Sequence, residues 1–211
     1  MAMKPYQQLT HSVVFELEEK RSRFLCYLYP VTSREQSLMR LESLRVEFPD
    51  ARHHCWAYVI GDPKQPITQA YNDDGEPAGT AGKPILNVLV QRGAGDACAI
   101  VVRYFGGIKL GAGGLVRAYG SSVSQALDHA TLAAKIPLAE LSVLIDFNFE
   151  AVARRLVARC SGEVLEVNYG VEVTLVVVLP IDQEGIFRKA LQSSTSGSAT
   201  IQACGSATIQ A

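Results

Sequence analysis

Five glycines lie within nine residues, Gly106 to Gly114, after an apolar run and the tripeptide Arg103-Tyr104-Phe105. Glycine tolerates positive φ and lets backbone N–H groups approach a ligand, and a helix predicted after this loop would offer unpaired N–H groups to an anion. We therefore predict that the loop binds phosphate, with cations around it and a tyrosine that stacks or positions it. The same glycines would also suit a tight strand-to-helix turn without a ligand. The candidate binding residues of this segment are Arg103, Tyr104, Gly106, Gly107, Lys109, Gly111 and Arg117.

A second polar segment, Asp73-Asp74-Gly75-Glu76-Pro77, follows the predicted strand Thr68 to Tyr71. Asp73, Asp74 and Glu76 are candidate site residues, because a carboxylate there can act as a general acid or base, or bind a hard cation. Asp-Gly is also turn chemistry, in which Asp73 would cap backbone amides. Both polar segments follow strands of one sheet, and unpaired buried carboxylates are costly. We therefore expect the three acids within a side-chain length of the loop from Arg103 to Lys109.

Two further candidates are His54 and Lys83. Adjacent residues of a strand point to opposite faces, so only one of His53 and His54 can face the same site as the loops. The alternation places His54 on one face with Trp56 and Tyr58, which indicates sheet packing or a stacking platform for a base. Lys83 follows a Gly-Thr-Ala-Gly run, but the glycine spacing is too short for a P-loop and a proline stands where the hydroxyl belongs.

Three motifs together resemble the bacterial branch of the IMPACT family: Arg103 to Gly107, Asp73 to Pro84, and the pair His53-His54. This resemblance spans residues 10 to 190. It implies an N-terminal domain similar to the second domain of ribosomal protein S5, and a C-terminal ferredoxin-like domain similar to domain V of elongation factor G. It also implies a role near translation, since the eukaryotic relatives restrain a stress-responsive initiation-factor kinase by competing for its activator.

The composition, with 48% apolar residues and a net charge of −1, is typical of a globular chain without a global polyanion-binding signature. Residues 1–135 carry 15 basic and 13 acidic side chains, and residues 136–211 carry 5 and 8, so contact with nucleic acid requires a local basic patch. No apolar run reaches bilayer length and no signal peptide is evident, so we expect a cytoplasmic protein without a membrane partner. The five scattered cysteines favour neither a disulfide framework nor a metal site, and we expect Cys26, Cys55 and Cys98 in the core.

Hydrophobic periodicity predicts two α+β domains, residues 1–135 and 136–211, with a linker at 132–137. The second domain has the order strand, helix, strand, strand, helix, strand of a ferredoxin-like unit. Its tail repeats Gly197-Ser-Ala-Thr-Ile-Gln-Ala203 as Gly205-Ser-Ala-Thr-Ile-Gln-Ala211. One copy suffices for an edge strand, and we expect the second copy to be disordered.

The leading hypothesis is a translation-associated binding protein that engages RNA, the ribosome or a ribosome-bound partner through the glycine-rich loop and the acidic segment. It requires no cofactor and no metal, and a ligand that contains phosphate would suit it. The alternative is a hydrolase or transferase acting on a phosphorylated or peptidyl substrate, with an acidic residue of the Asp73 to Glu76 segment as acid or base. The sequence does not give the oligomeric state.

Overall fold

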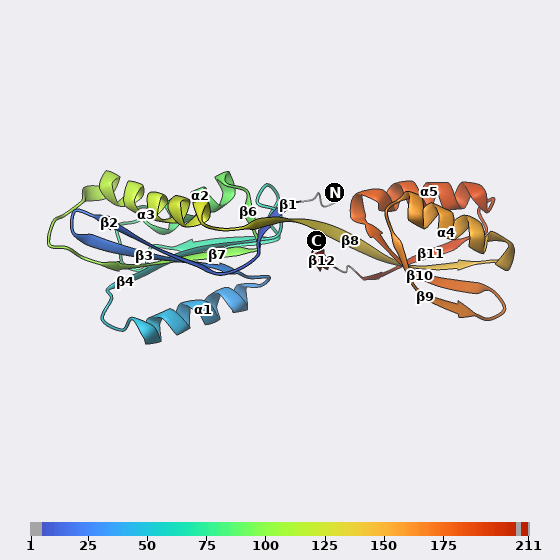
Figure 1. Ribbon diagram of the computed structural model, residues 1–211, viewed down its shortest axis with the longest axis horizontal. Helices are drawn as coiled ribbons and strands as arrows, with labels where there is room; N and C mark the ends of the chain where they lie inside the picture. Colours follow the sequence, from blue (N-terminus) through green and yellow to red (C-terminus); the bar gives the residue numbers. More distant parts are fainter. Residues whose placement is uncertain (1–5, 206–207, 211) are drawn as a thin grey trace. The chain divides into compact units, whose positions relative to one another are not determined.

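A computed structural model describes residues 6–205 and 208–210, and the chain divides into an N-terminal unit, Tyr6–Ala134, and a C-terminal unit that begins at Lys135 (Figure 1). Strand β8 (Leu132–Ile145) carries the chain from one unit to the other. The division between the units falls within the linker expected at 132–137, but the residues there form a regular strand. Independent folding of residues 1–135 and 136–211 stays a prediction.

The N-terminal unit is built on a five-stranded antiparallel sheet in the order β2-β3-β7-β4-β5. The turn between β2 and β3 contains Lys20 and Arg21, both at positive φ (48° and 64°), which is the geometry of a two-residue hairpin. The elements of the unit are β1 (Tyr6–Leu9), β2 (Val13–Glu19), β3 (Ser22–Pro30), α1 (Arg34–Glu47), β4 (His53–Ile60), β5 (Thr68–Asn72), α2 (Gly82–Gln91), β6 (Ala94–Gly95), β7 (Ala97–Tyr104) and α3 (Gly111–Asp128).

Helices cover both faces of this sheet, with α2 and α3 on one face and α1 on the other (Figure 1). The central strand β7 is buried on both sides, since Val101 packs under α2 and α3 whereas Ile100 and Val102 pack under α1. Because side chains alternate along a strand, Arg103 belongs to the α2–α3 face and Tyr104 to the α1 face. This alternation decides which of the predicted residues can share a site.

The C-terminal unit has the strand order β11-β8-β10-β9, with helices α4 and α5 on one face of the sheet (Figure 1). Every pair in this order is antiparallel, and the arrangement confirms the predicted ferredoxin-like fold. Its further elements are α4 (Glu150–Arg159), β9 (Glu163–Tyr169), β10 (Val173–Pro180), α5 (Glu184–Ser194), β11 (Thr200–Gly205) and β12 (Thr208–Gln210).

The first copy of the terminal repeat supplies the edge strand β11, as expected. The described part of the second copy, β12, pairs with Lys135 to Pro137 of β8, so the disorder expected there is wrong for these residues. Residues 206, 207 and 211 lie outside the described part of the chain.

Four cysteines are buried, and Cys204 is exposed. Cys26, Cys55 and Cys98 lie on strands of the N-terminal core, as predicted, and Cys160 lies at the end of α4. Burial raises the pKa of each of these four thiols above its ordinary value. Among the described residues, no helix combines the length and the apolar character that crossing a membrane requires.

Candidate functional site

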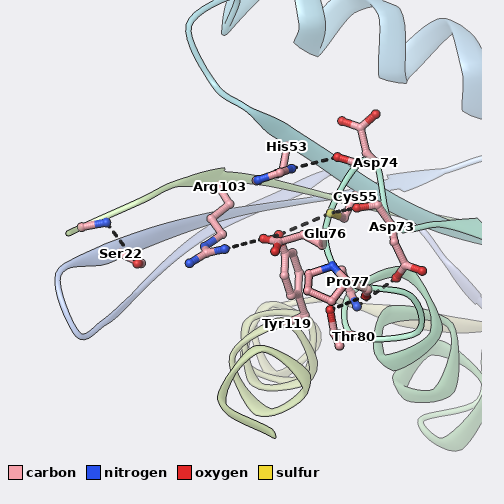
Figure 2. A network of polar contacts seen from close by, with 12 residues as sticks. Ser22, His53, Cys55, Asp73, Asp74, Glu76, Pro77, Thr80, Arg103 and Tyr119 are labelled. Carbon is pink, nitrogen blue, oxygen red and sulfur yellow. Dashed lines mark hydrogen bonds and ion pairs between the residues drawn. The ribbon is translucent and has the colours of Figure 1, made fainter. Parts of the chain in front are cut away.

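A buried charge network joins the acidic segment to the strand that leads into the glycine-rich loop (Figure 2). Glu76 Oε1 accepts hydrogen bonds from Arg103 Nη1 at 2.5 Å and from the Tyr119 hydroxyl at 2.8 Å. The side chains of Glu76 and Arg103 are only 4% and 7% exposed. The guanidinium group lies 5.4 Å from the ring centre of Phe24 and 5.7 Å from that of Phe105. The network thus fixes the acidic segment against β7 and α3.

This network forms one wall of a pocket of about 310 Å³ on the α2–α3 face. Its polar lining consists of Arg52, His53, Glu76, Arg103 and Lys109, and the first turn of α3 also reaches it. Its apolar lining includes the exposed ring of Phe105. The expectation that the acidic segment and the loop from Arg103 to Lys109 lie together holds for Glu76, which contacts Arg103 directly.

The N-termini of α2 and α3 differ in what satisfies their amides. Asp73, nine residues before α2 begins, accepts the N–H groups of Gly79, Ala81 and Gly82 at 2.8–3.0 Å. The α3 terminus at Gly111 has neither a side-chain cap nor an acidic residue in its first turn. The helix dipole and the free amides favour an anion there. The first helix end is thus filled by the protein's own carboxylate, and the second opens into the pocket.

Two exposed cations stand beside this uncapped end. Arg52 and Lys109 line the pocket, and neither forms an ion pair within the described part of the chain. The charge of Arg103, by contrast, is already balanced by Glu76. The free positive charge of the pocket therefore comes from Arg52, Lys109 and the α3 terminus.

Asp74 does not line the pocket, although it precedes Glu76 by only two residues. Its backbone adopts φ of 42°, and its carboxylate accepts the His54 N–H at 2.7 Å and Arg45 Nη2 at 3.3 Å. Asp73 and Asp74 both bind backbone amides, which is the turn and capping role considered from the sequence.

His54 and Tyr104 lie on the α1 face, so their assignment to the same site as Arg103 is wrong. His54 is 5% exposed, burial lowers its pKa, and its Nε2 atom has no hydrogen-bond partner among the residues that the structure describes. The Tyr104 hydroxyl donates to Asp50 at 2.9 Å. The histidine that reaches the pocket is His53, whose Nδ1 lies 2.8 Å from the carbonyl oxygen of Asp74.

The remaining predicted residues have separate environments. Gly106 packs against the β2–β3 turn, where a Cβ atom would lie 2.0 Å from the carbonyl carbon of Arg21, so this glycine is required for packing. Gly107 and Gly111 adopt positive φ of 85° and 71°. The exposed side chains of Lys83 and Arg117 do not line the pocket.

Sequence reasoning missed Arg52, Phe105 and Tyr119 as site residues. Tyr119 lies two helical turns after Gly111 on the buried side of α3, and this periodicity could have indicated it. His53 alternates with Cys55 and Ala57, which pack under α2 and α3, so the strand pattern could have favoured it over His54. Nothing in the local sequence distinguishes Arg52. Across the described chain, no group of three or more His, Cys, Asp or Glu side chains is arranged to hold a metal ion.

Comparisons with known proteins agree with this architecture. The Impact N-terminal domain matches residues 20–127, and a domain of unknown function, DUF1949, matches residues 143–198. The IMPACT family member YigZ of Escherichia coli is 42% identical over 181 residues, which cover 86% of this chain and 89% of YigZ. Protein IMPACT of Xenopus laevis is 35% identical over 98 residues, 45% of this chain and 31% of that protein.

A crystal structure described only as that of a hypothetical protein is 39% identical in sequence, with a TM-score of 0.67. The match covers 96% of this chain and 98% of that one. Both domain matches and the extent of the similarity to YigZ lead to one conclusion: the chain belongs to the IMPACT family.

Proposed function

We propose that this protein binds the phosphate backbone of RNA during translation, on the ribosome or beside it, through the pocket on the α2–α3 face of its N-terminal unit. The observation that carries the proposal is the uncapped α3 terminus, which opens into the pocket between Arg52 and Lys109, two cations without an ion pair among the described residues. Phosphate contacts of this kind give affinity without base specificity. The translation context rests on the resemblance to the eukaryotic members of the family.

The roles within the site differ from those expected from the sequence. Arg103 is held by Glu76 and positions Phe105 and the glycine-rich loop, so it is not the main phosphate contact. Phe105, 53% exposed, offers a ring on which a base can stack. In this arrangement Lys109 and Arg52 contact phosphate, and the amides of Gly111 and Ala112 complete the cradle.

The test uses a fluorescently labelled oligouridylate and measures anisotropy at several salt concentrations. We expect the double variant Arg52→Ala and Lys109→Ala to weaken binding and to reduce the salt slope by about 0.7 per lost contact with a single strand. The matched control is Lys83→Ala with Arg117→Ala, which removes two exposed cations outside the pocket. Equal affinity and equal salt slope for the wild type and the pocket variant would exclude this pocket as a phosphate-binding site.

The alternative, an enzyme, is favoured by one observation. Glu76 lines the pocket, its Oε1 atom binds Arg103 and Tyr119, and its Oε2 atom forms no hydrogen bond within the described part of the chain. A carboxylate with one bound and one free oxygen can take up a proton from a substrate. Assays with p-nitrophenyl phosphate and a peptidyl p-nitroanilide test this role, and Glu76→Gln should abolish any turnover. Turnover that survives this change would exclude Glu76 as the acid or base.

A further inference from the structure

From residue 136 on, the basic residues of the C-terminal unit are confined to its helices, which also carry Glu150 and Glu184. All five basic residues from 136 to 211 lie on α4 and α5, namely Arg154, Arg155, Arg159, Arg188 and Lys189. The charged residues on its strands over the same range are all acidic: Glu140, Glu163 and Glu166. Lys135, at the start of β8, pairs in register with Gln210, away from these acids.

Alternation of side chains along the strands places the three acids on the face of the sheet opposite α4 and α5. The residues that pack with these helices alternate with them, as Leu141, Val177 and Val164 show. Strand register places Glu140, Val178 and Glu163 in one row, and Ser142, Val176 and Glu166 in the next. We call these six residues, together with Leu165 at the bulge of β9, the acidic face.

The acidic face has an apolar centre with carboxylates on both sides. Val176 and Val178 lie on β10, between Glu140 on β8 and the two glutamates on β9, and Val176 is partly exposed whereas Val178 is only 4% exposed. Leu165 extends this apolar centre and is 54% exposed. Two strand spacings separate Glu140 from Glu163, which is about 10 Å and equals the diameter of an α-helix. A helix lying along this face would therefore place its apolar side on Val176 and Leu165 and its flanks beside the carboxylates.

We propose that the acidic face docks an amphipathic helix of a partner protein, with an apolar stripe flanked by lysines or arginines. Charge complementarity selects this occupant, because nucleic-acid phosphates would be repelled by Glu140, Glu163 and Glu166. A second copy of the chain fits less well. Its basic residues lie on helices whose apolar sides, such as Leu156 and Phe187, are already buried in its own core. The proposal is independent of the pocket in the N-terminal unit.

The test uses the full chain and a synthetic leucine-lysine peptide of about 18 residues, long enough to form a helix. We expect saturable binding, with amide chemical-shift changes concentrated on β8, β9 and β10. Reversal of both exposed acids of β9, Glu163→Lys with Glu166→Lys, should weaken binding at least about tenfold, because like charges would then face each other. The control Glu172→Lys changes an exposed acid in the β9–β10 turn and should leave the affinity within about twofold.

Several outcomes would overturn the proposal: no binding of the peptide, equal binding to the reversed variant, or shift changes confined to the helices. Self-association that the double reversal abolishes would assign the face to a second copy instead. Binding of labelled oligouridylate to these strands would assign it to RNA. The amide spectrum of each variant and its melting temperature show that the fold is retained, and the pair Glu163→Gln with Glu166→Gln should give an intermediate loss of peptide affinity.

Discussion

Nine of the ten buried polar or charged side chains of the described chain lie in the N-terminal unit, whereas Thr195 alone is buried in the C-terminal unit. Thr195 satisfies its hydroxyl locally, by donating to the carbonyl oxygen of Leu191 at the end of α5. The N-terminal unit instead buries Glu76, Arg103 and His54 in its core. Because buried charge is costly unless it is paired, this difference indicates where the molecule maintains a precise polar arrangement. The first unit builds a pocket, and the second presents its charges only at its surface.

The strongest test of this contrast compares two Glu–Arg pairs, one in each unit. Glu76→Ala leaves Arg103 buried without its partner and should destabilise the N-terminal unit by about 3–5 kcal/mol. Glu184→Ala breaks the partly exposed pair with Arg188, whose atoms lie 2.7 Å apart, and should cost less than about 1 kcal/mol. Denaturant unfolding followed by the fluorescence of Trp56, the single tryptophan, reports the N-terminal unit, and far-UV circular dichroism reports both units. Similar decreases in the free energy of unfolding for the two variants would contradict the difference between the two units.

A smaller effect is expected at Asp73, which stabilises the start of α2 from outside the helix. Asp73→Ala leaves three amides without their acceptor and should cost about 1–3 kcal/mol. Asp73→Asn retains one acceptor oxygen and should cost less. Hydrogen exchange at Gly79, Ala81 and Gly82 is the direct readout, and it should accelerate in both variants. Unchanged exchange at these amides would show that the carboxylate does not hold the helix end.

The smallest effect is a pH dependence confined to the N-terminal unit. Burial lowers the folded-state pKa of His54 below the value of about 6.5 for an exposed histidine. As the pH falls, the unfolded chain therefore takes up a proton at His54 before the folded chain does. The free energy of unfolding is therefore unaffected by His54 above about pH 6.5 and decreases below it, until the pH reaches the folded-state pKa. The Trp56 unfolding midpoint should fall in this window more steeply for the wild type than for His54→Gln. Parallel curves for the two proteins would contradict this assignment.

Patterns with a fixed period predicted the fold well. Ser33 and Gln36 have the spacing of a capping box at the start of α1, and Ser33 Oγ accepts the Gln36 N–H at 3.3 Å. In a capping box the Gln36 side chain would also accept the Ser33 N–H. Here Gln36 Oε1 accepts the N–H of Thr32 instead. The boundary between the units was predicted as a linker, but an extended segment with a proline can continue as a strand wherever it finds a pairing edge.

The candidate site was predicted less completely, because a list of polar residues does not say which face each one occupies. Arg103 and Tyr104 were grouped from adjacent positions, yet they lie on opposite faces of the sheet. Alternation on β7 contains this information, and it applies equally to the choice between His53 and His54. The pairing of Glu76 with Tyr119 depends on contacts between distant segments, which no local pattern provides.

Each unit contains at least one buried cysteine, so the alkylation rate of its thiols can report how often that unit opens. Cys26, Cys55 and Cys98 are buried in the first unit and Cys160 in the second, and burial suppresses the reactive thiolate form of all four. A pulse of alkylating reagent would modify the exposed Cys204 at once and each of the others only when its surroundings open. Mass spectrometry of the labelled chain would then give the opening rates of the two units separately, in one sample and without any substitution.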